Sequence, residues 1–204
     1  MGVTYSTEVC ASNAGTFVKS LCIPSRPGTL VRSLRLVNVS VAQAFGLFCD
    51  IGIPLLTQRF SNYEQTLADC LSERQRCFTA REQDLHHTDY AQIGALMARS
   101  WGLSPTVCLA VRLHHDYSVF SDPLVQETVS RLVAMGLVAK AATQRFAGMS
   151  GSTEWDKSGD CAAGALLLTG QEADDWIDRI CRDFANGQPD ECTSPSTPCS
   201  SRPN

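Results

Sequence analysis

The sequence has 204 residues, and 44% of them are apolar, which is enough for one domain with a substantial core or for one domain with a tail. The formal net charge is −4 and the pI is near 5.5, so the chain lacks the basic balance typical of proteins that bind nucleic acids or anionic membranes. The ten cysteines include no CxxC pair and give no support to a zinc ribbon.

Several cysteines lie within apolar helical patterns, where a reduced cysteine packs as a small hydrophobic residue; examples are Cys49, Cys70, Cys108 and Cys181. Residues 1–20 lack the basic start and the long apolar run of a secretory signal. No stretch offers the roughly 18 apolar residues that a membrane span needs. We therefore expect a reduced, cytoplasmic protein.

The first part of the chain predicts two helices. Residues 3–22 have a weak apolar periodicity, and the proline and glycine of Ser25-Arg26-Pro27-Gly28 predict a break after them. Residues 41–48 predict a helix, and Gly52 and Pro54, a usual pair of stop signals, follow it.

The middle of the chain predicts further helices with clear start signals. Residues 62–81 form an amphipathic pattern that predicts one helix, with Glu82 at its end or in the following loop. Asp89 and Gln92 stand three residues apart, as in a capping box, and predict a helix that ends at Gly102.

Ser104-Pro105 combines an N-cap with a proline in the first turn and predicts a helix that ends at His114 and His115. His114 falls on the apolar side of this helix. Trp101 ends the apolar stripe of the preceding helix, made with Tyr90 and others, and we expect it in the core.

In the last third of the chain, Ser121-Asp122-Pro123 repeats the cap-then-proline signal and predicts a long helix to about Ala142. Residues 143–157 resemble a loop, and residues 161–168 predict a short helix of small residues. Thr169 or Gly170 opens the last helix.

These patterns predict an all-α fold, a compact multi-helix domain at residues 41–185 with no internal repeat. Residues 1–40 are expected to form a diverged helical N-terminal segment. Residues 186–204 consist mostly of Pro, Ser, Thr, Asp and Asn, and they have too little apolar surface to offset the entropy of ordering. We expect a disordered C-terminal tail there.

Between Phe45 and His115 lie four separated motifs: Cys49-Asp50-Ile51-Gly52, Asp89-Tyr90-Ala91-Gln92-Ile93-Gly94, Trp101-Gly102-Leu103-Ser104-Pro105 and His114-His115. Their order and spacing resemble the HDOD family, the HD-related output domain of bacterial signalling proteins. The family pattern has a His-Asp-Ile-Gly-like turn, a glutamate, an Asp-His-x-x-Val-Gly-like helix start, Trp-Gly-Leu-Pro and a helix that ends in His-His. The resemblance covers about residues 40–145 and implies an HD-like helical fold.

The sequence departs from the family pattern where related HD phosphohydrolases bind metal. Cys49 and Tyr90 stand at positions of histidines, one serine is inserted before Pro105, and no histidine precedes His86. In the related enzymes, histidines and aspartates hold a divalent metal that activates water. The resemblance therefore implies a degenerate metal site, in which Tyr90 fills the volume of a histidine and offers a hydroxyl for hydrogen bonding.

Six residues are the candidates for a ligand site or a vestigial metal site: Asp50, Glu82, His86, His87, His114 and His115. Each also has a structural interpretation. Asp50 can bond nearby backbone N–H groups, a histidine at a helix C-terminus can bond free carbonyls, and His86 and His87 can be solvated loop residues. Glu82 can pair with an arginine or a histidine. Which metal would bind, if any, stays unknown at this point.

The first functional hypothesis is a non-catalytic regulatory module of bacterial signal transduction, which contacts a signalling protein or a small-molecule ligand and has no cofactor, nucleic-acid or membrane partner. The second is a diverged HD-type phosphohydrolase that acts on a nucleotide with a divalent metal at Asp50 and His86, His87 or His114. The third is a decayed paralogue. The second hypothesis predicts Asp50, His114 and another ligand within about 5 Å of one another.

Overall fold

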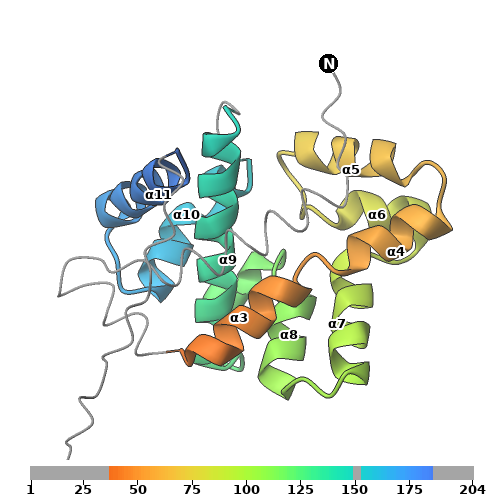
Figure 1. Cartoon of the computed structure of the whole chain (residues 1–204), viewed down its shortest axis with the longest axis horizontal. Helices are drawn as coiled ribbons and strands as arrows, with labels where there is room; N and C mark the ends of the chain where they lie inside the picture. Colours follow the sequence, from red (N-terminus) through yellow and green to blue (C-terminus); the bar gives the residue numbers. More distant parts are fainter. Residues whose placement is uncertain (1–36, 149–152, 186–204) are drawn as a thin grey trace, which may run out of the picture.

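The computed structural model describes residues 37–148 and 153–185, and every regular element in these two ranges is a helix (Figure 1). This confirms the all-α prediction. The predicted helix at residues 3–22 and the predicted tail at residues 186–204 lie outside the described residues. In chain order the elements are α3 (Val39–Phe48), α4 (Gly52–Arg59), α5 (Tyr63–Ser72), α6 (Ala80–His86), α7 (Tyr90–Ser100), α8 (Pro105–Leu113), the 3-10 helix η1 (Tyr117–Phe120), α9 (Glu127–Phe146), α10 (Thr153–Ala165) and α11 (Gly170–Ala185).

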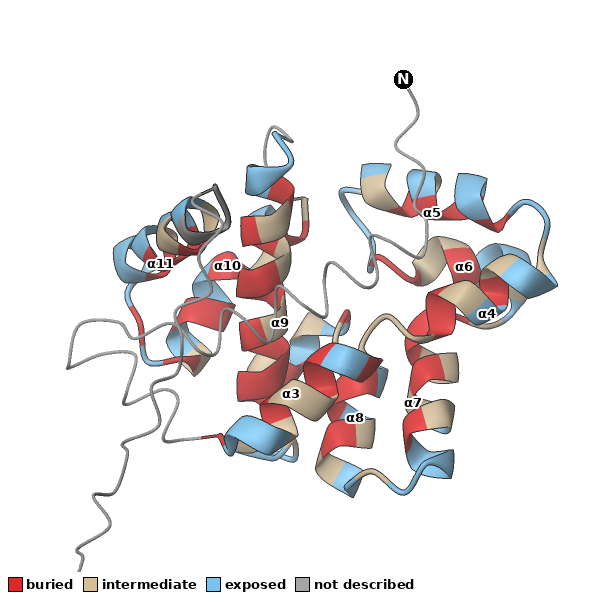
Figure 2. Cartoon of the chain, viewed as in Figure 1, coloured by how far each residue is buried: buried red, intermediate tan, exposed pale blue. Residues whose placement is uncertain are grey.

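The helix α9 is the centre of the larger of two hydrophobic cores. It is buried around most of its circumference, and α3, α8, α10 and α11 pack against it (Figure 2). The smaller core lies among α4, α5, α6 and the start of α7, and its members are Ile53, Leu56, Tyr63, Leu67, Cys70, Phe78 and Tyr90. Tyr90 therefore belongs to the smaller core while its hydroxyl reaches the histidines that follow α8.

Two helix starts occur where side-chain caps predict them. The Asp89 carboxylate accepts a hydrogen bond from the backbone N–H of Gln92 at 2.7 Å. The Ser104 hydroxyl accepts one from the N–H of Val107 at 3.4 Å, and a proline begins α8. The end of α3 at Phe48 and the start of α11 at Gly170 also agree with the predictions.

The interpretation of Gly52 and Pro54 as helix stops is wrong, because both residues lie in the first turn of α4. Gly52 has a packing role instead. A Cβ atom at this position would lie 2.1 Å from the carbonyl oxygen of Tyr90, so only glycine lets the start of α4 approach the start of α7 this closely.

The single helix predicted for residues 62–81 is also wrong, because α5 ends at Ser72 and α6 begins at Ala80. In the intervening loop the Glu73 side chain accepts hydrogen bonds from the backbone N–H groups of Gln75 and Arg76. From α10, the Lys157 ammonium donates to the carbonyl oxygens of Glu73 at 2.8 Å and of Arg76 at 2.9 Å. These contacts satisfy backbone groups that a continuous helix would have paired internally.

The C-terminal helices have other boundaries than predicted. The predicted start at Ser121-Asp122-Pro123 is a turn in which the Asp122 carboxylate accepts from the N–H of Leu124, and α9 begins later, at Glu127. Helix α9 continues to Phe146, and α10 begins at Thr153, within the segment expected to be a loop.

The prediction of Trp101 in the core is wrong, since this side chain is 64% exposed and contacts Phe48 edge-on. Helix α7 buries its side of small residues, among them Gly94 and Ala98. A Cβ on Gly94 would lie 3.2 Å from the carbonyl oxygen of Phe48, so this side packs closely on α3. Trp101 is the C-cap, past the last buried turn.

The prediction that no stretch is long and apolar enough to cross a membrane is wrong for Val39–Arg59, which could do so by length and composition alone. In the structure this stretch comprises α3 and α4, and it buries Phe45, Phe48, Ile53 and Leu56 against the rest of the protein. Among the described cysteines all are free thiols: Cys49, Cys70, Cys77, Cys108, Cys161 and Cys181.

Candidate functional site

The structure brings three of the six candidate residues to one small cavity. Asp50 lies in the turn between α3 and α4, and His114 and His115 follow α8 directly. The cavity has a volume of about 40 Å³, and Cys49 and Lys140 also line it. Such a volume holds a water molecule, whereas pockets for small-molecule ligands are on the order of 300–1,000 Å³.

Tyr90 links the two histidines of this site. Its hydroxyl forms a short hydrogen bond with the Nε2 atom of His115, and it lies 3.2 Å from the Nε2 atom of His114. The Nδ1 atom of His114 lies 2.7 Å from the carbonyl oxygen of Val111 and donates to it. The predicted role of Tyr90, a buried hydroxyl in the place of a histidine, agrees with this geometry.

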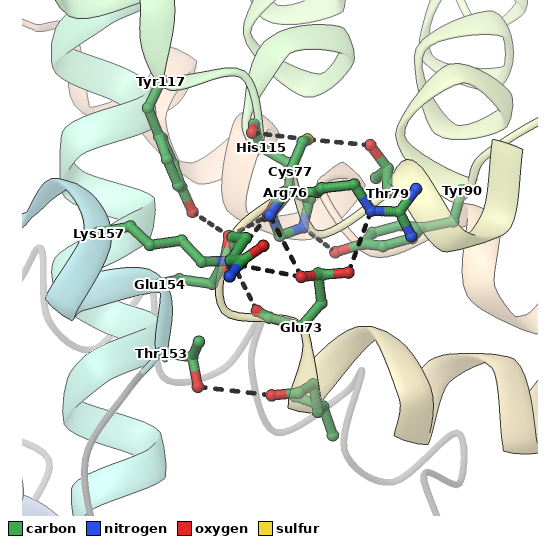
Figure 3. Close-up of polar contacts among 12 residues, drawn as sticks. Glu73, Arg76, Cys77, Thr79, Tyr90, His115, Tyr117, Thr153, Glu154 and Lys157 are labelled. Atoms are coloured by element: carbon green, nitrogen blue, oxygen red, sulfur yellow. Dashed lines mark hydrogen bonds and ion pairs between the residues drawn. The ribbon is translucent and has the colours of Figure 1, made fainter. Parts of the chain in front are cut away.

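The second ring nitrogen of His115 faces a buried carboxylate that sequence reasoning missed. The Nδ1 atom of His115 lies 3.3 Å from Glu154 Oε2 (Figure 3). Glu154 is 3% exposed and also accepts from the Tyr117 hydroxyl at 2.6 Å and from the Lys157 ammonium at 2.8 Å. Glu154 lies in a segment predicted to be a loop, and two of its three partners, His115 and Tyr117, are more than 35 residues away in the sequence.

The loop between α5 and α6 covers the ring of His115. The ring of Phe78 stacks on the imidazole with centroids 4.5 Å apart and an angle of 12° between the planes. The Cys77 thiol donates to the carbonyl oxygen of His115 at 3.0 Å. The Lys140 ammonium lies 4.3 Å from the centre of the Phe78 ring, and the Lys140 side chain also lines the cavity.

Burial and charge set the protonation of this network. Burial lowers the pKa of His115, and Lys140 and His114 lower it further. Burial also lowers the pKa of His114, although the Asp50 carboxylate acts in the opposite direction. Burial raises the pKa of Tyr90, so its hydroxyl keeps its proton. Both histidines are therefore neutral at neutral pH.

Burial alone would raise the pKa of Glu154, but its interaction with His115, the charge of Lys140 and the hydrogen bond from Lys157 hold this pKa below its ordinary value. Glu154 is thus a carboxylate that only accepts, and the proton of a neutral His115 lies on Nδ1. The Tyr90 hydroxyl then donates to Nε2 of His115. Because His114 uses its own proton on Val111, no proton remains for the 3.2 Å contact between Tyr90 and His114.

Glu82, the fourth candidate, is fully buried in the first turn of α6 and not in a loop. The Tyr63 hydroxyl donates to its Oε1 atom, whereas Oε2 has no hydrogen-bond partner in the described part of the chain. Burial raises the pKa of Glu82 to about 8, so the carboxyl group is largely protonated at neutral pH. The prediction that Glu82 pairs with an arginine or a histidine is wrong, because its hydrogen-bond partner is Tyr63.

His86 and His87 occupy the end of α6. The Nε2 atom of His86 lies 3.0 Å from the Thr66 hydroxyl, and its ring stacks on Phe60 with centroids 4.3 Å apart. His87 is exposed and is the C-cap, with a left-handed φ of 54°. The expected loop around this pair is instead a helix end.

Within residues 37–148 and 153–185, no group of three or more His, Cys, Asp or Glu side chains is placed to hold a metal ion. The candidates that do come together share their cavity with the Lys140 ammonium. The Cys49 thiol donates to the carbonyl oxygen of Gly46 at 3.4 Å. The residues at this site therefore do not fit a divalent cation as they stand.

The fold and the site together define an all-α domain in which two histidines follow a helix and the second, His115, is hydrogen-bonded to Tyr90 and to the buried Glu154. The family model of the HDOD domain matches residues 19–117, a range that includes α3 to α8 and both histidine pairs. The chain therefore contains an HDOD domain at residues 19–117, just under half of its length. Searches of curated proteins and of solved structures found no match.

Proposed function

We propose that this HDOD domain is a non-catalytic regulatory module of bacterial signal transduction, which acts in the cytoplasm through contacts with a protein partner or a small ligand. The presence of an HDOD domain is consistent with a signalling-associated module. The observation that carries the proposal is the use of His115, whose two ring nitrogens are both hydrogen-bonded to side chains, those of Tyr90 and Glu154.

A metal-dependent phosphohydrolase needs histidine and carboxylate lone pairs that converge on one point. Here the lone pair of His115 is directed at the Tyr90 hydroxyl, and the Tyr90 side chain fills the position of a family histidine. A cation placed in the cavity would also face the Lys140 ammonium, and charge repulsion in a buried site is costly. These features support a role without metal catalysis.

The size of the cavity supports the same proposal. A volume of about 40 Å³ has no room for a nucleotide beside Asp50 and His114. The polar groups instead form contacts between distant parts of the chain. Glu154 in α10 binds both His115, two residues after α8, and Tyr117, which begins η1. We infer that the network fixes the relative positions of these helices.

The test is the metal content of the protein, measured by elemental analysis after expression in rich medium and purification without a chelator or a histidine tag. The Asp50→Ala variant is analysed beside it. We expect far less than one equivalent of metal in both samples and no hydrolysis of cyclic dinucleotides or nucleoside phosphates. Near one equivalent of metal that Asp50→Ala loses, together with hydrolysis, would overturn the proposal in favour of a diverged phosphohydrolase.

A further inference from the structure

A second surface of the domain is a groove between α7 and α8, and it shares no lining residue with the cavity at the histidine site. Its volume is about 540 Å³, and its floor includes the small side chains of Ala95 and Cys108. Two leucines on its walls are exposed to solvent, Leu96 by 58% and Leu109 by 40%. Exposed leucines on facing helices form the kind of apolar groove that binds an amphipathic helix.

The charges on this groove have one sign. Arg99 and Arg112 line it, and the sequence of both helices and their connection, residues 90–113, contains no aspartate or glutamate. Arg112 is partly balanced by the buried carboxylate of Asp89, at 3.8 Å. For Arg99, the described residues provide no acidic group within ion-pair distance. The chain as a whole has a net charge of −4, so the groove is a local exception.

The chain's own remaining segments do not match this chemistry. Residues 1–36 contain four basic residues and one acidic residue, and their charge would be repelled by the two arginines. Residues 186–204 contain two acidic residues but no aliphatic or aromatic side chain that could fill a leucine-walled groove. Helix α11 is acidic, but it already buries Trp176, Ile177 and Ile180 against the core.

We propose that the groove between α7 and α8 binds an amphipathic helix of a partner protein, with apolar residues on one face and acidic residues beside them. This inference rests on the proposed regulatory function and names the surface and the class of partner. The leucines of the partner would pack between Leu96 and Leu109, and its carboxylates would pair with Arg99 and Arg112 at the rim. Helix α7 has 11 residues, so about three turns of a partner helix would fit along it.

The acidic character of the partner follows from the arginines, because each planar guanidinium can bind a carboxylate through two hydrogen bonds. Figure 2 shows α7 and α8 side by side, with α11 at the opposite side of the view. Binding at the groove therefore leaves α11 and its surface arginines unaffected, and these provide a control.

The test uses a fluorescein-labelled synthetic peptide of about three helical turns, with leucines at positions i, i+3, i+4 and i+7 and glutamates beside them, and measures fluorescence anisotropy. A second peptide replaces every glutamate with lysine. We expect the full chain to bind the glutamate peptide at least about tenfold more tightly than the lysine peptide, because two charge pairs at a rim separate them.

Two surface variants test the location. Arg99→Glu should lose the preference for the glutamate peptide, and Leu96→Asp should weaken both peptides. Arg182→Glu, an exposed residue of α11, is the matched control and should bind as the unchanged chain does. All three side chains are exposed, so circular dichroism and thermal melting should show unaltered folding. Amide chemical shifts that change on binding should belong mainly to α7 and α8.

Three results would overturn the inference: equal affinity for the two peptides, unchanged binding by Arg99→Glu, or no binding of either peptide at millimolar concentration. Self-association that Leu96→Asp abolishes would also overturn it, since the groove would then bind a second copy of the chain. Each of these outcomes concerns the groove alone. The proposed function fails separately, on the metal content and hydrolysis described above.

Discussion

The two histidine pairs of this HDOD domain have the same form in the sequence and opposite environments in the structure. Both pairs end a helix, α6 for His86 and His87 and α8 for His114 and His115. His115 is 3% exposed and has side-chain partners on both ring nitrogens, whereas His87 is exposed to solvent. The elements packed around a helix end therefore decide what its last residues do.

The difference arises from segments that are distant in the chain. The carboxylate that meets His115 comes from α10, 39 residues later, and the aromatic ring stacked on it comes from the loop before α6. The end of α6 has no such cover: His86 contacts Thr66 and Phe60 of its own small core, and His87 is exposed. Burial thus converts one pair into a structural junction.

The largest expected effect on stability comes from replacing His115, and replacing one histidine of the other pair provides the comparison. His115→Ala removes a ring that pairs with Glu154 and Tyr90 and stacks on Phe78, and it leaves a buried carboxylate with a lost partner. We expect the free energy of unfolding to fall by about 3–5 kcal/mol, because the substitution leaves a cavity beside the Phe78 ring and removes one hydrogen bond from each of two buried side chains. Chemical denaturation at pH 7 measures it.

The matched variant is His87→Ala, which removes an exposed ring. Its free energy of unfolding should stay within about 0.5 kcal/mol of the original value, as for most surface substitutions. Similar losses for the two alanine variants would show that the buried network contributes nothing special and would remove the contrast between the pairs.

The next effect concerns the packing that brings the start of α4 against Tyr90. Gly52→Ala places a methyl group 2.1 Å from a backbone oxygen, which side-chain motion cannot relieve. We expect a loss of about 1–3 kcal/mol, the usual cost of overpacking. Gly164→Ala is the control, since a Cβ there meets nothing within 4 Å, and in helix α10 it should stabilise by about 0.5–1 kcal/mol. A neutral Gly52→Ala would contradict the close approach.

Local signals in the sequence predict one part of this fold and miss another. The starts of α7 and α8 are predictable because each cap and the N–H group it accepts from are three residues apart. The break between α5 and α6 is not, because Lys157 from α10 binds the loop carbonyl oxygens of Glu73 and Arg76. A contact across more than 80 residues leaves no trace in a helical periodicity.

The same reason explains the candidate site. The pair after α8 and the place of Tyr90 follow from the family motif, and the structure brings them together. Glu154 could not be predicted, since its partners His115, Tyr117 and Lys157 come mostly from other elements and its own segment contains small and polar residues typical of a loop. The prediction of Trp101 in the core failed for a related reason. It relied on a stripe of larger residues, whereas α7 buries mainly its small residues.

A third prediction concerns the pH dependence of stability that Glu82, buried beside the smaller core, gives to the protein. The folded-state pKa of Glu82 is about 8 and its ordinary value is 4.5, so between these values the folded protein keeps a proton that the unfolded chain has lost. Its contribution to stability is complete below the ordinary pKa and disappears as the pH rises through about 8. The free energy of unfolding should therefore fall with rising pH, by up to about 1.4 kcal/mol per pH unit for one proton.

Glu82→Gln tests this dependence, because an amide resembles the protonated carboxyl in shape and does not titrate. Between pH 6.5 and 8 the stability of the variant should decline less steeply than that of the unchanged chain, because every other titratable group is common to both proteins and its contribution cancels in the comparison. Urea denaturation at a series of pH values gives both slopes. Parallel slopes would mean that the buried carboxyl group of Glu82 is already ionised in the folded protein.

The smallest expected effect concerns His87, the exposed member of the pair at the end of α6. His87 has a φ of 54°, a left-handed conformation that costs a residue with a Cβ about 1 kcal/mol, and glycine adopts it freely. Because the exposed ring contributes little to packing, His87→Gly should raise the free energy of unfolding, by less than about 1 kcal/mol since glycine also gains entropy in the unfolded chain. His87→Ala keeps the strain and should show no gain, so the difference between the two variants, measured by urea denaturation, isolates the backbone conformation. A gain in stability from His87→Gly would show that this histidine is a replaceable cap of α6. A loss larger than that of His87→Ala would contradict the prediction, because the glycine would then lack an interaction that stabilises the end of α6.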